Sequence, residues 1–217
     1  MFFRKGGRNK ITIVVLLVLG YGCGKKNIDP LAPVVVANQA QYLEANKEAL
    51  LLAGPPLQKF GQNHPLDATD NIDIDHAIRL YRGILAYKPS DAAPYLTLGM
   101  CYQALGMDER AISAFKAYLI AGKALKGSAI VQSRTDTYWL LSKSYFDLHA
   151  YGEAADQAGK AIKLNPHIAR YYAQRAAALL QEKNYIQAKK DAETALKLDP
   201  SNVRAKGVIG LLNMSKS

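Results

Sequence analysis

A run of closely spaced carboxylates between Asp67 and Asp75 is the part of this chain that most resembles a site for chemistry. Carboxylates at alternating positions are the ligands of calcium-binding loops. The rest of that pattern is missing, because His76 stands where the sharp turn needs glycine and no glutamate closes the loop. We therefore expect Asp70 to Asp75 to cap the helix that follows, where carboxylates complement the positive end of the helix dipole.

The remaining reactive residue types do not form a catalytic group. The only cysteines are Cys23 and Cys101, and the four histidines show no metal-ligand spacing. Cys101 has no basic neighbour at helical spacing that would lower its pKa, so we expect it to be a small buried apolar residue. The chain also lacks a glycine-rich phosphate loop, a serine flanked by glycines and a zinc-protease motif. The sequence predicts a protein that is not an enzyme and needs no metal or cofactor.

The formal charge of +10 does not indicate a nucleic-acid binder. Residues 1–22 contain four of the 28 basic residues and none of the 18 acidic ones, so a chain cleaved before Cys23 carries +6. The remaining Lys and Arg residues are interleaved with Asp and Glu along the expected helices rather than gathered in one run. This distribution is typical of a solvated surface, and we expect no nucleic-acid partner.

The first 23 residues have the layout of a bacterial export signal. Arg4, Lys5, Arg8 and Lys10 precede an apolar run from Ile11 to Leu19, which is too short for a comfortable membrane-spanning helix. The segment that follows, Leu19-Gly20-Tyr21-Gly22-Cys23, resembles a lipoprotein signal. That resemblance implies cleavage before Cys23 and lipidation of Cys23. The chain would then be anchored to a bacterial membrane, with the rest of the protein outside the cytoplasm in the cell envelope.

The signal also departs from the lipoprotein pattern. Gly20 stands where that family prefers leucine, and Tyr21 is bulkier than the usual residue. Ordinary cleavage, a retained signal anchor, or a cytosolic protein with an apolar start are therefore alternatives. If Cys23 is lipidated, Cys101 has no partner left for an intramolecular disulfide.

The elements that position these residues follow a repeat of fixed length. Pro166 and Pro200 lie 34 residues apart and close the similar phrases Ala161-Ile162-Lys163-Leu164-Asn165-Pro166 and Ala195-Leu196-Lys197-Leu198-Asp199-Pro200. A period of this length indicates an array of helical hairpins, each of which buries its apolar face only by stacking on its neighbours.

The residues within each period resemble the tetratricopeptide repeat. The clearest example has Tyr95, Leu98, Gly99 and Tyr102 on its first helix, followed by Ala111 and Phe115 on its second. Small residues recur at the eighth and twentieth repeat positions, where the two helices of a hairpin approach most closely. They are Gly99, Ser142 and Ala176, and Ala111, Ala154 and Ala188. The resemblance implies an all-α tetratricopeptide solenoid with a C-terminal capping helix.

Outside the complete repeats the pattern is less regular. Gly54-Pro55-Pro56 predicts the end of a first helix that begins near Ala37, and Gln58 to Asn71 disfavours helix. Gly122 to Ser133 lengthens a helix and a loop, and Asn202 is expected to cap a last helix that ends near Met214. The expected organisation is a signal peptide (1–22), a linker (23–36) and a repeat domain (37–217) that contains a degenerate repeat (37–89), complete repeats (92–121, 135–166, 169–200) and the cap (202–214).

The resemblance also implies which side chains face a partner. In tetratricopeptide domains, the second, fifth, ninth and twelfth residues of each first helix line a concave groove. In this chain the expected groove residues are Leu96, Met100, Gln103, Asp136, Trp139, Lys143, Phe146, Arg170, Ala173, Ala177, Leu180, Arg204 and Leu211. A lone aromatic on a helix is also commonly a core residue, so the alternative interpretation is that Trp139 packs in the core.

These features favour a membrane-tethered scaffold or adaptor of the bacterial cell envelope that binds a protein or peptide in its groove. The subclass that clamps a terminal carboxylate needs Lys, Asn and Arg residues, and the corresponding positions here hold Leu96, Met100, Leu140 and Arg170, of which only Arg170 matches. Two alternatives remain, namely a cytosolic or inner-membrane co-chaperone-like adaptor and a structural scaffold that associates with itself. The sequence predicts neither the partner nor the oligomeric state.

Overall fold

The computed structural model describes residues 32–214, and within that range it contains nine helices and no strand. The helices are α1 (Gln39–Gly61), α2 (Ala68–Tyr87), α3 (Ala92–Ala104), α4 (Asp108–Ala121), α5 (Ser128–Asp147), α6 (Tyr151–Leu164), α7 (Ala169–Gln181), α8 (Tyr185–Leu198) and α9 (Val203–Met214). The signal peptide, Cys23 and most of the linker lie outside the described residues.

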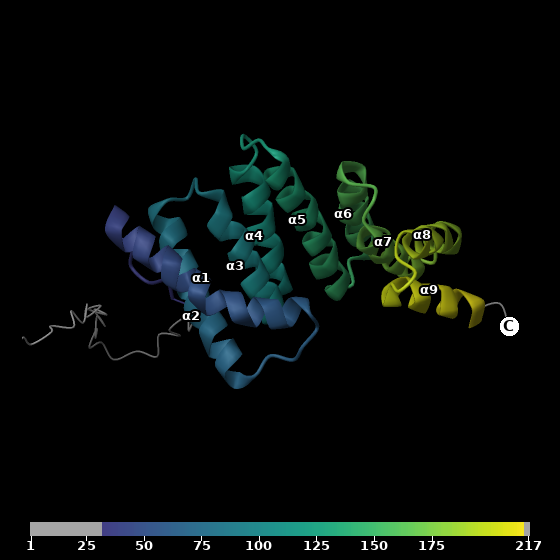
Figure 1. Cartoon of the computed structure of the whole chain (residues 1–217), viewed down its shortest axis with the longest axis horizontal. Coiled ribbons are helices and arrows are strands. Elements are labelled where there is room, and N and C mark those ends of the chain that lie inside the picture. The colour runs from purple at the N-terminus through teal and green to yellow at the C-terminus, as the bar shows by residue number, and fades with distance from the viewer. Residues whose placement is uncertain (1–31, 215–217) are drawn as a thin grey trace, which may run out of the picture.

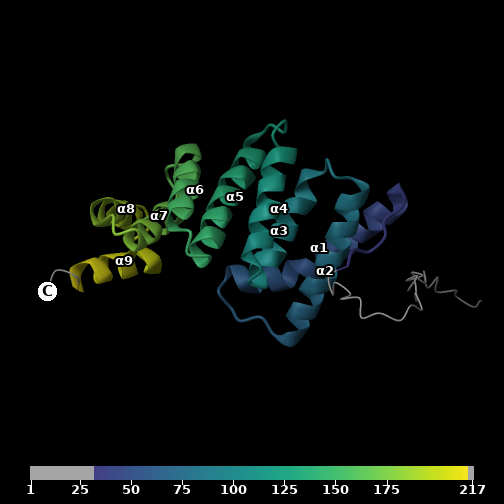
Figure 2. The ribbon, with the colours of Figure 1, turned by 180° about the vertical axis from the view of Figure 1, so that it is seen from behind.

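The helices form an extended array of hairpins. Each odd-numbered helix from α1 to α7 packs against the even-numbered helix that follows it, and neighbouring hairpins stack in chain order. Figure 1 shows this order running from α1 and α2 to α9, and Figure 2 shows the same order from behind. At the end of the array α9 packs against both α7 and α8. The prediction of an all-α helical solenoid with a C-terminal capping helix is confirmed.

The small residues of the repeat lie where the helices of a hairpin meet. A Cβ added to Gly99 on α3 would come within 2.5 Å of the ring of Phe115 on α4. Ala111, Ala154 and Ala188 are completely buried at the matching positions of the second helices. A larger side chain at any of these positions would force two helices apart, which is why the sequence pattern predicts the packing so well.

Two apolar clusters make up the core. The N-terminal cluster comes from α1 to α5 and contains large side chains such as Ile74, Tyr81 and Phe115. The C-terminal cluster comes from α6 to α9 and consists mostly of alanine, with Leu179, Val208 and Leu212 among its few larger members. The C-terminal half therefore depends on close helix approach rather than on bulky side chains.

Helix α5 separates the two clusters with buried polar side chains that are all hydrogen-bonded. The Ser142 hydroxyl donates to the Ala154 carbonyl at 2.7 Å, and the Gln103 amide donates to Ser144 Oγ at 2.8 Å. On the other side the Gln174 amide donates to the Ser142 carbonyl at 3.3 Å. These bonds tie α5 to α3, α6 and α7. They also satisfy buried polar groups that would cost stability if they were left unpaired.

The expected helix stop at Gly54-Pro55-Pro56 is wrong. Helix α1 continues through Pro55 and Pro56 to Gly61, so the non-helical stretch shrinks to residues 62–67. A proline inside a helix removes a backbone hydrogen bond and costs about 3 kcal/mol. Here Ala53, Pro56 and Leu57 are buried in or beside the N-terminal cluster, and this burial offsets the local preference.

The acidic run caps α2 through Asp67 and Asp70, so of the expected residues Asp70 takes part in the cap and Asp73 and Asp75 do not. The Asp67 carboxylate accepts the Asp70 amide hydrogen at 2.9 Å, and the Asp70 carboxylate accepts the Asp67 amide hydrogen at 3.0 Å. This reciprocal capping box begins the helix at Ala68, so Asp73 and Asp75 lie in its second turn rather than at its cap. Lys59 from α1 bonds both Asp70 oxygens, at 2.8 and 2.9 Å.

The other irregular segments agree with their predictions. The connection between α4 and α5 spans residues 122–127, and α5 begins at Ser128, ahead of the repeat position at Thr135. This insertion makes α5 a 20-residue helix where α3 and α7 have 13. The Asn202 side chain accepts the Ala205 amide hydrogen at 3.1 Å and caps α9, as expected.

Candidate interaction surface

Trp139 on α5 lies at the centre of the candidate surface. Its side chain is half-buried and belongs to neither apolar cluster. Lys143, one helical turn further along α5, places its ammonium 5.2 Å from the centroid of the indole ring. Arg170 at the start of α7 places its guanidinium carbon 4.8 Å from the same ring. Trp139 is therefore held between two cations rather than packed into a core.

The same cations connect Trp139 to other helices. The Lys143 ammonium is also 5.2 Å from the ring centroid of Phe60 near the end of α1. We call Phe60, Lys143, Trp139 and Arg170 the cation–aromatic row. It crosses α1, α5 and α7. Each side chain contacts the next one in the row, so the row links side chains that are more than 100 positions apart in sequence.

The Asp136 carboxylate fixes the position of Arg170 in the row. Arg170 forms an ion pair with the Asp136 carboxylate, and the Tyr171 hydroxyl donates to that carboxylate at 2.7 Å. Gln132 donates to it as well, at 2.9 Å. Burial and the Asp136 bond raise the pKa of Tyr171. This network keeps the guanidinium over Trp139 and leaves Arg170 exposed on its outer side.

Lys143 is partly dehydrated in this environment. Burial lowers the pKa of its ammonium, while the nearby Asp147 carboxylate acts in the opposite direction and Arg204 adds to the lowering. Burial also raises the pKa of Asp147, with a further contribution from Asp108. An ammonium that has already lost part of its hydration has less to lose when an anion binds, which suits Lys143 to partner contact.

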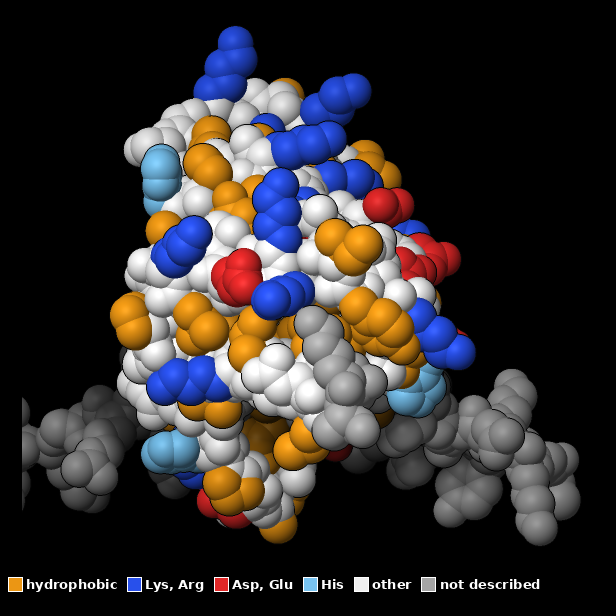
Figure 3. Space-filling view, turned by 90° about the vertical axis from the view of Figure 1, so that its right-hand side faces the viewer, with side chains coloured by type: hydrophobic (Ala, Val, Ile, Leu, Met, Phe, Trp, Pro, Cys, Tyr) orange, Lys and Arg blue, Asp and Glu red, His pale blue; other side chains and the backbone are white. Residues whose placement is uncertain are grey.

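A second cation–aromatic contact lies nearer the carboxyl end. Arg204 on α9 is 5.7 Å from the ring centroid of Phe146 on α5, and Phe146 also meets Tyr151 edge to face at 5.3 Å. Helix α9 carries Arg204 and Lys206 and no acidic residue. Figure 3, which faces the carboxyl-terminal end, shows basic side chains predominating over acidic ones with apolar side chains between them.

The structure does not bring all of the expected groove residues together. Leu96 and Met100 pack against the N-terminal cluster, and Leu180 packs against the C-terminal cluster. The Gln103 amide is buried and bonds the Leu140 carbonyl as well as Ser144, so its assignment to a solvent-facing groove is wrong. Ala173 and Ala177 are buried too, whereas Arg170, Arg204 and Leu211 are exposed.

Sequence reasoning missed Phe60 and Tyr171. Phe60 fell in a stretch that was expected to be non-helical, and Tyr171 followed directly after a groove position without being assigned a role. A lysine 83 positions away cannot be matched to Phe60 by helical periodicity, because the contact depends on how the hairpins stack. No sequence signal pointed to it.

A tetratricopeptide repeat model matches residues 92–119 and 169–202. The match identifies these two segments as tetratricopeptide repeats. The two matches cover α3 with most of α4, and α7 with α8, which are two of the three complete repeats expected from the sequence. Gly99 and the Phe115 ring that packs against it are the packing pair within the first match.

Known proteins resemble the chain in sequence or in fold. Small glutamine-rich tetratricopeptide repeat-containing protein 2 of Saccharomyces cerevisiae is 47% identical over 60 residues, which is 28% of this chain and 17% of the yeast protein. The crystal structure of MamA has a TM-score of 0.59 at 24% identity and covers 70% of this chain and 86% of its own. The first tetratricopeptide domain of Spaghetti (RPAP3), solved with an HSP90 peptide, has a TM-score of 0.50 at 22% identity over 57% of this chain and 91% of its own.

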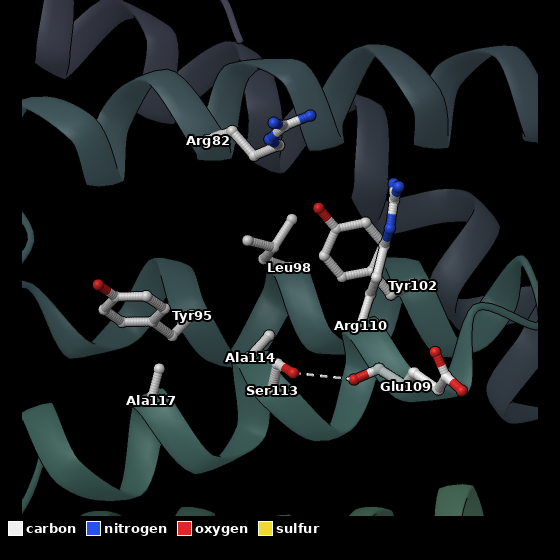
Figure 4. A pocket seen from close by; sticks show the side chains of 9 residues that line it. All are labelled: Arg82, Tyr95, Leu98, Tyr102, Glu109, Arg110, Ser113, Ala114 and Ala117. Carbon is white, nitrogen blue, oxygen red and sulfur yellow. Dashed lines mark hydrogen bonds between the residues drawn. The ribbon is translucent and has the colours of Figure 1, made fainter. Parts of the chain in front are cut away.

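A separate cleft lies at the first tetratricopeptide repeat. Its volume is about 560 Å³, and it is open to solvent between α2 and α4 above α3. The lining residues are Arg82, Tyr95, Leu98, Tyr102, Glu109, Arg110, Ser113, Ala114 and Ala117 (Figure 4). None of them belongs to the cation–aromatic row, so the repeat array presents two separate surfaces.

The structure adds three facts on the remaining sequence-based expectations. Cys101 is completely buried, as predicted, and burial raises the pKa of its thiol to about 12. Within residues 32–214, no cluster of three or more His, Cys, Asp or Glu side chains could hold a metal ion. No helix in the same range is long and apolar enough to cross a bilayer.

Proposed function

We propose that this chain is a membrane-tethered adaptor of the bacterial cell envelope that binds a protein or peptide partner along the cation–aromatic row. The observation that carries the proposal is the position of Trp139. It is half-buried, lies outside both apolar clusters and is flanked by Lys143 and Arg170. Large aromatic side chains with adjacent cations are typical anchors of protein interfaces.

The row offers a partner two kinds of contact at once. An apolar or aromatic side chain packs on the face of Trp139, and acidic groups pair with Lys143 and Arg170. Because the Asp136 network already holds Arg170 in place, less side-chain entropy is lost when the partner binds. The row thus favours a partner segment that combines apolar and acidic residues.

The membrane tether is supported by the first 23 residues. The basic head, the apolar run and the small residue before Cys23 are the features from which we infer an acylated amino terminus. A lipid there needs a second signal for stable anchoring, and diacylation of the lipoprotein type would supply it. We propose that the repeat domain then faces the periplasm.

The test is capture of the partner by the full, anchored chain. The tagged protein is crosslinked in membranes, and mass spectrometry compares the captured proteins with those from Trp139→Ala. Tyr185→Ala serves as the matched control, since Tyr185 is an exposed aromatic on α8, away from the row. A partner that is lost with Trp139→Ala and kept with Tyr185→Ala supports the proposal. A partner captured equally by both variants refutes it.

Two other functions stay open to the same experiments. A self-associating scaffold would show concentration-dependent sedimentation of the purified chain, with no second protein in the crosslinked complex. A cytosolic or inner-membrane co-chaperone-like adaptor would retain residues 1–22 and capture cytosolic proteins. The carboxylate clamp gives this second function little support, because Leu96 and Met100 are packed against the core where polar clamp residues are needed.

A further inference from the structure

We propose that the cleft between α2 and α4 is a second docking site, and that it binds an extended peptide segment in which an acidic residue lies next to an apolar one. The cleft goes beyond the proposed function because it shares no residue with the cation–aromatic row.

The cleft exists because two side chains are missing from the first complete repeat. Ala114 and Ala117 occupy the twenty-third and twenty-sixth repeat positions. In the second repeat the same positions hold Gln157 and Lys160, and the Lys160 ammonium lies 5.7 Å from the ring centroid of Tyr138 and covers it. Tyr95 is the equivalent of Tyr138, and an alanine at position 117 leaves it lining an open cavity.

The third repeat fills the same space in another way. Asp191, at the twenty-third position, forms a two-pronged ion pair with Arg175 at 2.6 and 2.8 Å. The Arg175 guanidinium carbon then lies 6.0 Å from the ring centroid of Tyr172, which is the equivalent of Tyr95. Two of the three repeats therefore cover this tyrosine from within the chain. The first repeat leaves the place for an external group.

The cleft is basic toward one end and apolar toward the other. Figure 4 shows the guanidinium groups of Arg82 and Arg110 toward the side of Tyr102, with Tyr95 and Ala117 at the opposite end. Arg110 is exposed and stacks over the Tyr102 ring at 5.9 Å. The Glu109 carboxylate points away from the Arg110 guanidinium (Figure 4), so it does not neutralise that charge. A carboxylate at the arginine end and an apolar side chain at the Tyr95 end match this arrangement.

The open shape favours a peptide over a small molecule. The floor consists of buried side chains, Leu98, Tyr102 and Ala114, while Glu109, Arg110 and Ser113 on the rim are exposed. Small-molecule sites usually enclose most of their ligand. A trough that covers one side of its ligand suits an extended chain, which gains further contacts beyond the cleft.

The test uses the full chain in detergent and a randomised display library of peptides as the probe. We expect enrichment of sequences that pair an acidic with an apolar residue, and we then measure the affinity of a synthetic consensus peptide. Arg110→Glu removes the charge match. Ala117→Lys fills the cleft as Lys160 does in the second repeat, although it makes the site more basic. Each variant is expected to weaken binding about tenfold.

Two controls separate this site from general charge effects and from the row. Lys123→Glu makes the same charge change as Arg110→Glu at an exposed position after α4, and it should leave affinity unchanged. Trp139→Ala should also leave affinity unchanged, so failure of this site is distinguishable from failure of the row. Circular dichroism confirms that each variant is folded.

Several results would overturn the proposal. Absence of enrichment, equal binding to Arg110→Glu and Lys123→Glu, or loss of binding with Trp139→Ala would each do so. Binding of the chain to anionic phosphatidylglycerol vesicles through Arg110, without peptide binding, would identify a lipid headgroup as the occupant instead. Self-association that is lost with Arg110→Glu would identify a second copy of the chain.

Discussion

The carbonyl oxygen of Val34 occupies the space that a side chain on Gly83 would need. A Cβ at Gly83, on α2, would lie 1.9 Å from that oxygen. The segment that precedes α1 is held there by two hydrogen bonds, from the Val34 amide to the Arg79 carbonyl at 3.0 Å and from Arg79 Nε to the Ala32 carbonyl at 3.2 Å. The chain that leads from the amino terminus is thus fastened along α2.

Gly83→Ala should therefore release residues 32–37 from α2. The helix itself gains up to about 1 kcal/mol from alanine, whereas burial of Val34 and Val36 is lost, so the two effects on stability oppose each other. The measurement is limited proteolysis, in which cleavage before α1 becomes faster. Gly207→Ala is the matched control, because its Cβ meets nothing within 4 Å. Unchanged cleavage in Gly83→Ala would contradict the prediction.

Trp139→Ala should weaken partner binding by at least about 2 kcal/mol, the size of an interface hot spot. The melting temperature should change little, because Trp139 lies outside both apolar clusters. Titration calorimetry with the captured partner and thermal unfolding test the two halves of the prediction. Strong destabilisation with intact binding would show that Trp139 serves the fold.

Lys143→Gln should weaken binding of an acidic partner while the chain stays folded. Glutamine removes the charge and keeps most of the side-chain length over Trp139 and Phe60. Lys143→Glu would disturb the structure more, because the Asp147 and Asp108 carboxylates lie near residue 143 and would repel a glutamate there. Affinity measured at low and high salt should differ less in Lys143→Gln than in the parent. Equal salt dependence would exclude a role for this charge.

Removal of residues 203–217 should destabilise the chain by several kcal/mol. Ala205, Val208 and Leu212 of α9 are buried in the C-terminal cluster, and a few hundred Å² of exposed apolar surface costs about 25 cal/mol per Å². Denaturant unfolding and sedimentation should show lower stability and more aggregation. Leu211→Ala, at an exposed position of α9, should have little effect. A truncated chain as stable and monomeric as the parent would show that α9 is a dispensable tail.

Cys23→Ala should move the protein from the detergent phase to the aqueous phase. Intact mass spectrometry of the parent chain should find a lipid-bearing amino terminus at Cys23. Cys101→Ala is the matched control and should leave the partition unchanged, because the Cys101 thiol is completely buried. A mature chain that begins elsewhere and carries no lipid would refute the tether.

The stability of the fold should fall in alkaline solution, in part through Cys101. Burial raises the pKa of this thiol from 9.0 to about 12, so the unfolded chain loses the proton first as the pH rises. The free energy of unfolding that the protonated Cys101 thiol contributes is intact below pH 9. Above pH 9 it decreases by up to about 1.4 kcal/mol per pH unit. Tyr81, whose pKa burial also raises, acts in the same direction. Urea unfolding across this range should show a smaller loss for Cys101→Ala.

The repeat pattern alone determined the fold. Gly99, Ala111 and their equivalents mark where helices must approach within the distance of a small side chain, and this requirement is local to each hairpin. The cap of α9 is local in the same way, because the Asn202 side chain accepts a hydrogen bond from the amide three residues later. Interactions that span only a few positions along the chain can be predicted from spacing.

Tertiary packing decided the rest. Pro55 and Pro56 stay helical because burial against the N-terminal cluster outweighs their local preference. The polar side of α5 buries Gln103, which the repeat register placed in a groove. Phe60 meets Lys143 across 83 positions, because the stacking of hairpins sets which side chains of distant helices lie together. The helices are therefore encoded locally in the sequence, whereas the surfaces they share form only when the array is assembled.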